Sequence, residues 1–280
     1  MFASYMLHTW IMASILAMAT GILGYFVILW RSVFAAHALP LAAFPGAAAA
    51  PLLGISPLWG LFFFSGLGVL FLRLFSLLGR KDIAMGLLLT TFLALGGLLL
   101  SMGQEYSAAV FSLLFGEILG ISGRSFLPMV LIALLVLLLV LANFRSLLLQ
   151  SVSPALAAAA GISRSRLDWL VLALLALVTA GALPIVGTLL TFTLLVSPAA
   201  SAQRLCSHPF WSLVLSVFLA ETMTWLSIAM AFWTNWPPGF FVGTLGAVLF
   251  LLSHLTARFR SGLRPSADTA GRPGLSSDPA

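Results

Sequence analysis

Long apolar stretches separated by short basic breaks dominate this sequence. Only 7% of the 280 residues are charged, whereas 61% are hydrophobic. A soluble domain of this length needs far more charged surface than these residues supply. Because a helix satisfies its own backbone hydrogen bonds in lipid, the composition predicts an all-α fold: a polytopic membrane helical bundle.

The length of the apolar stretches sets the expected number of spans. One span needs about 20 apolar residues, so the chain has room for roughly eight to ten, and we predict nine. The predicted spans are residues 6–30, 37–53, 57–78, 83–100, 126–147, 167–186, 187–205, 210–233 and 239–256. The second contains Pro40, Pro45 and Pro51, which predicts a bent or broken helix. The sixth and seventh meet at Pro184 and Gly187 with almost no loop.

The basic residues predict the orientation, because they fall at alternate ends of the spans and therefore on one side. They are Arg31, Arg80, Lys81, Arg145, Arg164, Arg166, Arg204, Arg258, Arg260, Arg264 and Arg272. Arg73 lies one or two turns inside that same end, and only Arg124 falls on the other side. The positive-inside rule makes the basic side cytoplasmic, with the N-terminus outside and the C-terminus inside. Trp10, Trp59, Trp233 and Trp236 fall near the expected outer interface.

Two segments do not fit a simple span. Residues 101–125 contain Glu105 and Glu117, and their apolar part predicts a re-entrant or interfacial helix at about 107–120. On the basic side, a run of alanines between Pro154 and Gly161 predicts a short helix. Residues 1–257 are expected to form the membrane domain. The polar residues 258–280 are expected to be a disordered cytoplasmic tail.

The sequence also excludes some chemistry. It contains no nucleotide-binding loop, nucleophile elbow or zinc-protease motif, so neither catalysis nor ATP hydrolysis by this chain is expected. The single Cys206 excludes an internal disulfide. The functions that remain are transport, a channel or a scaffold.

Two polar side chains inside spans are candidate functional residues. His37 precedes the proline-rich second span, and an imidazole there suits a borderline metal such as Zn²⁺ or Mn²⁺. Glu221 lies near the middle of the eighth span, where a carboxylate is costly and needs a reason. The alternatives are an interfacial histidine and a buried carboxyl that only packs against a neighbouring helix. On the outer side, Glu117 is a candidate contact for a cation or an acceptor protein.

Several segments together resemble the permeases of ABC importers for zinc, manganese or ferrous iron. Residues 183–187 (Leu-Pro-Ile-Val-Gly) with 194–202 resemble that family's valine-glycine and proline-alanine-alanine segment, which includes Gly187 and Pro198. Residues 44–46 (Phe-Pro-Gly), 114–120, 153–161 and 233–239 match further family segments in the same order. The resemblance covers residues 10–256.

The resemblance implies a fold and a set of partners. The chain would be a type II ABC-importer-like permease in a prokaryotic plasma (inner) membrane, with two copies lining one pathway. A cytoplasmic ATPase dimer would dock on the coupling segment at about 150–166, which includes Pro154 and Gly161. An extracytoplasmic metal-binding protein would deliver a divalent metal, with no cofactor bound permanently.

One departure from the family affects the metal site. The family often has an aspartate, and a histidine four residues later, before its leucine-proline-glycine; here these positions are His37 and Leu41. A site with fewer hard ligands suits Mn²⁺ less well. The competing hypotheses are a permease for a metal chelate or organic nutrient, an ATP-independent channel or carrier that uses Glu221 as a relay, and a structural membrane subunit.

Overall fold

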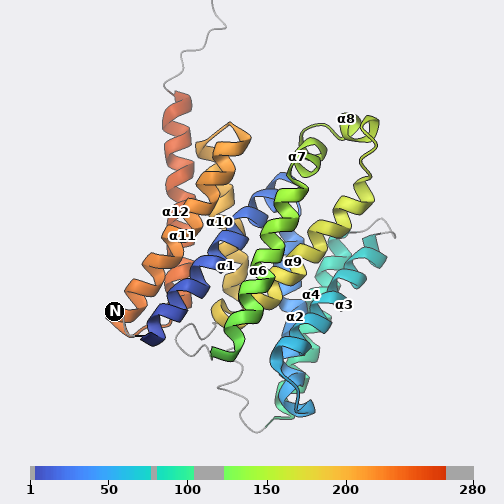
Figure 1. Ribbon diagram of the computed structural model, residues 1–280, viewed down its shortest axis with the longest axis vertical. Helices are drawn as coiled ribbons and strands as arrows, with labels where there is room; N and C mark the ends of the chain where they lie inside the picture. The colour runs from blue at the N-terminus through green and yellow to red at the C-terminus, as the bar shows by residue number, and fades with distance from the viewer. Residues whose placement is uncertain (1–3, 77–80, 104–122, 263–280) are drawn as a thin grey trace, which may run out of the picture.

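The computed structural model describes residues 4–76, 81–103 and 123–262, and every regular element in them is an α-helix (Figure 1). The helices are α1 (Ser4–Leu29), α2 (Val33–Leu53), α3 (Pro57–Ser76), α4 (Lys81–Ser101), α6 (Gly123–Ala142), α7 (Phe144–Val152), α8 (Pro154–Ala159), α9 (Arg164–Val186), α10 (Thr188–Leu205), α11 (Pro209–Thr234) and α12 (Pro238–Gly262). The predicted all-helical class is therefore confirmed for the part of the chain that the structure describes.

Each of the nine predicted spans coincides with a helix, but the number nine is not confirmed. Among the described residues, six helices are long and apolar enough to cross a membrane, and α6 with α7 makes a seventh if the bent pair is one span. Within the described part of the chain, α4 contributes a shorter apolar helix, Met85–Ser101, and α10 does not qualify. The reason lies in α10 itself, because threonines and serines interrupt its apolar sequence.

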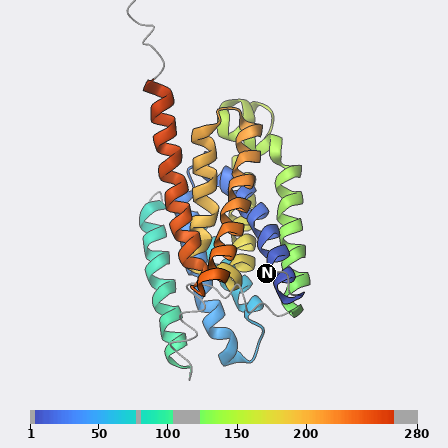
Figure 2. The same ribbon diagram turned by 90° about the vertical axis from the view of Figure 1, so that its left-hand side faces the viewer.

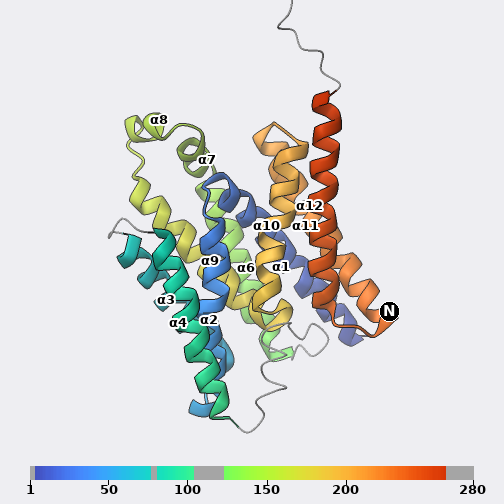
Figure 3. The ribbon, with the colours of Figure 1, turned by 180° about the vertical axis from the view of Figure 1, so that it is seen from behind.

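The helices run up and down between two ends of the bundle. The α1, α3 and α10 helices finish at one end of the bundle, and α7, α8 and the start of α9 lie at the same end (Figures 1 and 3). The α12 helix also finishes there, whereas α1 starts at the opposite end. The described basic residues therefore gather at one end, with the exception of Arg124 at the start of α6, as the alternation of charges predicted. Which end faces the cytoplasm is not fixed by this arrangement.

Two groups of helices flank the middle of the bundle. The α2, α3 and α4 helices pack together on one side, and α10, α11 and α12 pack together on the other (Figure 3). The α12 helix lies along the outside against α10 and α11 (Figure 2). It continues to Gly262, five residues past the predicted domain boundary at 257, and residues 263–280 lie outside the described residues.

The proline-rich α2 helix is continuous, so of the two predicted alternatives, a bent or a broken helix, the broken one was wrong. Pro40, Pro45 and Pro51 all lie within it, and nearly every residue from Ala35 to Ala50 is buried. Prolines are tolerated in membrane helices where neighbouring helices cover the disturbed backbone. That cover is close here: a Cβ atom on Gly46 would collide with the backbone of Gly60 on α3.

The fifth predicted span, residues 126–147, is divided between two helices. The α6 helix bends by 58° at Asn143 into α7, which extends to Val152. The short helix predicted between Pro154 and Gly161 is confirmed as α8, with Ser153 accepting a hydrogen bond from the Leu156 N–H. Gly161 has a φ of 74°, which glycine adopts without strain, and it turns the chain toward α9.

Candidate functional site at the junction of α2 and α10

The α10 helix starts directly after α9, as the sequence predicted. Gly187 is the only residue between them, and its φ of 85° and ψ of 166° fit essentially only glycine. Its N–H donates to the Leu183 carbonyl at 2.9 Å, and its own carbonyl accepts from the Thr191 hydroxyl at 2.7 Å. The predicted motif residue Gly187 therefore has a structural reason to be glycine.

The α10 helix carries several buried hydroxyls, as α11 also does. Thr188, Thr191, Ser197 and Ser201 are all buried, and so is the motif residue Pro198. The Ser197 hydroxyl donates to the Gly246 carbonyl on α12 at 2.5 Å. We did not single out Thr188 or Thr191 in the sequence, although hydroxyls in an apolar segment are a usable signal.

Two of these hydroxyls have no partner. Those of Thr188 and Ser201 lack a hydrogen bond within the described part of the chain. An unpaired buried hydroxyl lowers stability. A transported ion, a water molecule or a second subunit could supply the missing hydrogen-bond or coordination partner of each hydroxyl.

His37 lies at the junction of α2 and α10. Its half-buried ring meets the ring of Phe192 on α10 edge to face, with centroids 4.9 Å apart. The flanking Ala36 and Ala38 are fully buried, so His37 is a polar group at the edge of an otherwise apolar helix face. Leu41, where the family often has a histidine, is also buried.

Glu221 lies at a different interface, between α11 and α1. Both of its carboxylate oxygens are buried without a hydrogen-bond partner among the described residues. Ser14 and Trp225 lie beside the carboxyl, and the Trp225 indole N–H donates to the Ser14 hydroxyl at 2.8 Å. Glu221 therefore sits in a small polar cluster where α11 packs against α1.

The structure does not place these two candidate ligands in one metal cluster. His37 packs on α10 and Glu221 lies beside α1, and the described residues contain no group of three or more His, Cys, Asp or Glu side chains that could hold a metal. Glu117 and the predicted re-entrant segment at 107–120 lie outside the described residues.

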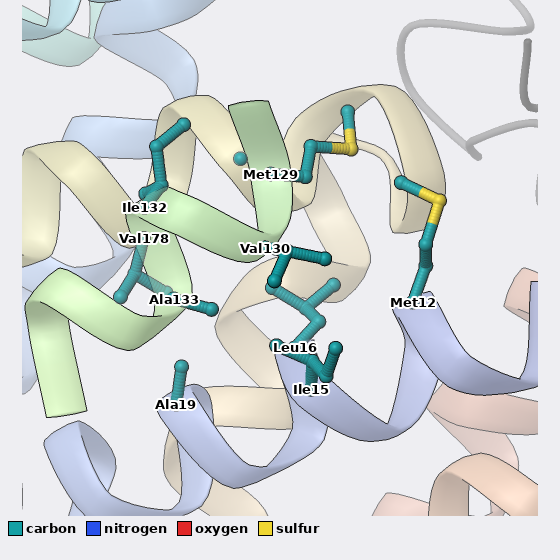
Figure 4. Close-up of a pocket in the computed structure, with 10 residues that line it drawn as sticks. Met12, Ile15, Leu16, Ala19, Met129, Val130, Ile132, Ala133 and Val178 are labelled. Atoms are coloured by element: carbon teal, nitrogen blue, oxygen red, sulfur yellow. The ribbon is translucent and has the colours of Figure 1, made fainter. Parts of the chain in front are cut away.

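A small pocket between α1, α6 and α9 is too apolar to bind an ion. Its volume is about 20 Å³, which is room for about one water molecule. The lining side chains labelled in Figure 4 are Met12, Ile15, Leu16, Ala19, Met129, Val130, Ile132, Ala133 and Val178. The pocket is a packing gap in the middle of the bundle rather than part of a polar pathway.

Comparison with known proteins gives the family. Residues 3–257 match the ABC 3 transport family. The manganese import system permease protein ScaB of Streptococcus parasanguinis is 31% identical over 251 residues, which cover 88% of this chain and 89% of that protein. The manganese transport system membrane protein MntC of Listeria monocytogenes is 27% identical over 241 residues, 85% of each chain.

A solved structure supports the same family assignment. The chain matches PsaBC from Streptococcus pneumoniae in complex with Fab with a TM-score of 0.81 and 27% identity, over 90% of this chain and 91% of that chain. The chain therefore belongs to the ABC 3 transport family. It is a multi-pass membrane protein and a permease subunit of an ABC transporter, as the ordered sequence segments predicted.

Proposed function

We propose that this chain is the permease subunit of an ATP-driven importer for a divalent metal ion, with manganese, zinc and ferrous iron as the candidate substrates. The observation that carries the proposal is likeness over nearly the whole length to a protein named as a manganese import permease, 88% of this chain and 89% of the relative.

The proposed assembly contains two copies of the chain, an ATPase dimer and an external metal-binding protein. The α8 helix supports the ATPase position, because it projects at the basic end of the bundle and all of it except Ala157 is at least partly exposed. Val152 and Leu156 are 70% and 61% exposed beside it. Exposed apolar side chains at an end of a membrane bundle favour a protein partner.

The proposed topology has nine crossings, with the basic end in the cytoplasm and the N-terminus outside. The α4 and α10 helices would also cross, because each joins two neighbours that run in the opposite direction. The α10 helix would cross as a covered helix, whereas α4 exposes apolar side chains such as Leu87 and Leu98. A helix shielded by protein does not need a fully apolar sequence. The positive-inside rule supports the assignment of the basic end.

The proposed pathway runs along the junction of α2 and α10. His37 would offer an imidazole to the metal, and the Gly187–Pro198 part of α10 would form the adjoining wall. One imidazole is an incomplete site, so we propose that a second copy of the chain supplies the rest of the ligands. Glu221, at the α1–α11 interface, would form a second polar contact site for the metal, separate from the site at His37.

The test is ATP-dependent uptake by the assembled transporter. The permease, its ATPase and its binding protein are reconstituted into liposomes, and accumulation of radioactive Mn²⁺, Zn²⁺ and Fe²⁺ is measured with and without ATP. We expect ATP-dependent accumulation of at least one of the three ions. An assembled complex that hydrolyses ATP but accumulates none of them would contradict the proposal and favour a metal chelate or an organic nutrient.

A further inference from the structure

A second cavity, larger and polar, lies at the basic end of the bundle, away from the α2–α10 junction at His37. Its volume is about 310 Å³, and it is enclosed by the turn between α1 and α2, the end of α3, α4, the α7–α8 segment and the start of α9. This volume suits a small ligand or the headgroup of a larger one. Its lining includes Gln150, Pro154 and Arg164 of the proposed coupling segment, but neither His37 nor Phe192 of the proposed metal pathway.

The charge of this cavity is strongly positive. Arg31, Arg73 and Arg164 line it, and the only acidic residue in its lining is Asp168. Asp168 already faces Arg73, with Nη1 and Oδ2 3.9 Å apart. Arg73 also donates to the Ser165 hydroxyl and lies over the Trp169 ring. Asp168 and its neighbours thus engage Arg73 rather than the other two arginines.

The guanidinium groups of Arg31 and Arg164 have no ion pair or hydrogen bond within the described part of the chain. Both side chains are exposed, and both belong to the cavity wall. Guanidinium groups bind phosphate through two parallel N–H donors, so a pair of them around one cavity suits a phosphate group.

The backbone at Arg31 is unusual. Its φ is 53°, the left-handed conformation that a non-glycine residue adopts at a cost. The turn is held in place, because the Trp30 indole N–H donates to the Leu147 carbonyl on α7 at 3.3 Å. A glycine or asparagine would fit this turn more easily, so the arginine side chain is the feature to be explained.

The position of the cavity favours a lipid. Leu29 is the last residue of one candidate span, Arg164 the first of another, and Arg73 lies two residues before the end of a third. The cavity therefore lies at the level where membrane meets water. Its wall is polar at Ser32 and Gln150 and apolar at Leu72, Met85 and Val171. Basic pockets between membrane helices at this level bind anionic headgroups.

We propose that this cavity binds the phosphate headgroup of an anionic phospholipid, through Arg31 and Arg164. Because Pro154 of α8 also lines the cavity, a bound lipid would connect the segment proposed to dock the ATPase with α1, α3 and α9. The lipid would hold that segment against the bundle. The binding itself does not depend on which metal is transported or in which direction.

The experiment is native mass spectrometry of the purified transporter complex titrated with phosphatidylglycerol or phosphatidylcholine. Arg31→Asn keeps a residue that tolerates the left-handed turn, and Arg164→Gln removes the second charge. Arg145→Gln is the matched control, because Arg145 is an exposed arginine on α7 at the same end but does not line the cavity.

We expect phosphatidylglycerol to bind more tightly than phosphatidylcholine. Each cavity variant should lose about fivefold in phosphatidylglycerol affinity, the double variant about 25-fold, and the control nothing measurable. A double variant that binds like the wild type, or a control that loses as much, would overturn the proposal. If Arg164→Gln does not assemble, the test is the phosphatidylglycerol affinity of Arg31→Asn compared with that of Arg145→Gln. A loss in Arg31→Asn alone supports the proposal, and equal affinities overturn it.

Inorganic phosphate is the second probe, because it shares the headgroup's chemistry. Competition by phosphate against phosphatidylglycerol, at constant ionic strength, would support the site. If phosphate binds through Arg31 and Arg164 while the two lipids bind equally, the lipid assignment is overturned and the cavity belongs to a soluble phosphate ligand.

Discussion

The α2 and α10 helices contact each other and are both largely buried, yet polar bonds contribute differently to the two. The α2 helix is made largely of alanine, proline and glycine, and it approaches α3 so closely that Gly46 and Gly60 touch through their backbones. The α10 helix carries hydroxyls and amides that bond to its neighbours: Ser197 donates to Gly246 on α12, and Gln203 donates to the Tyr25 carbonyl on α1 at 3.0 Å.

The comparison of α2 with α10 shows close packing and hydrogen bonding at work in one bundle. Small residues hold α2 by close packing, which tolerates no added atom. The α10 helix also packs closely, because a Cβ atom on Gly24 of α1 would collide with the Leu195 backbone. It differs from α2 in adding individual hydrogen bonds, each of which contributes about 1 kcal/mol. The edge-to-face contact of His37 with Phe192 lies where these two helices meet.

The largest expected effect comes from adding one methyl group to the close contact on α2. Gly46→Ala would place a Cβ atom against the Gly60 backbone, which cannot move aside as a side chain can. We expect a loss of at least about 3 kcal/mol in stability, at the upper end for overpacking. The readout is the fraction of permease that elutes as a monodisperse peak after detergent extraction.

Gly66→Ala is the matched control for this prediction. Gly66 lies on α3, the helix that Gly46 contacts, and a Cβ there meets open space. It should therefore extract like the wild type, with a small gain from better helix propensity. Equal extraction of both variants would show that close packing does not hold α2.

The next effect concerns transport rather than folding. His37→Ala should assemble normally because the side chain is only half-buried, but metal uptake should fall at least tenfold if the imidazole contacts the metal. His208→Ala, in the exposed turn before α11, should transport at the wild-type rate. Wild-type uptake by His37→Ala would remove His37 from the pathway while leaving the fold intact.

Glu221→Gln separates stability from function. Replacing the buried carboxyl by a neutral amide of the same shape keeps a negative charge out of the α1–α11 interface, which should raise stability by about 1 kcal/mol or more. Uptake should fall about fivefold if the metal contacts the carboxyl. Thr224→Val, which removes another buried and unpartnered group on α11, should raise stability without changing uptake. Thermal unfolding and initial uptake rates distinguish these results, and Glu221→Gln uptake at the wild-type rate would make Glu221 a packing residue.

The smallest effect tests the bonding of α10. Ser197→Ala removes the hydroxyl that donates to Gly246, which should cost about 1 kcal/mol and lower the melting temperature by about 2–4 °C. Ser253→Ala is the control, because that buried hydroxyl bonds only within its own helix, to the Phe250 carbonyl. If both variants have the same melting temperature, the hydrogen bond between α10 and α12 does not hold α10 in place.

Local signals predicted much of the fold. The apolar stretches located the long helices, Pro154 and Gly161 bounded a short helix, and Gly187 marked the joint between α9 and α10. These features depend on residues close together in the chain. The continuity of α2 was not predictable, because it depends on how closely α3 covers its prolines.

The candidate site was less accessible from the sequence. His37 and Phe192 are 155 positions apart, and Glu221 meets Ser14 from the other end of the chain, so neither neighbour follows from local pattern. The sequence predicted α10 as a span with Gly187 and Pro198 as motif residues, but not that Thr188 and Thr191 would be buried. Metal ligation by His37 and Glu221, and contact at Glu117, stay predictions.

The most direct test of the proposed pathway uses a cysteine at position 37. Cys206 is the only native cysteine, so a Cys206→Ser background allows selective labelling of His37→Cys with a water-soluble maleimide during ATP-driven turnover. We expect labelling that the transported metal slows, and no labelling of Ala36→Cys, which faces the core with 0% exposure. Failure to label position 37 in any state, or labelling that the metal does not affect, would contradict a metal pathway at the junction of α2 and α10.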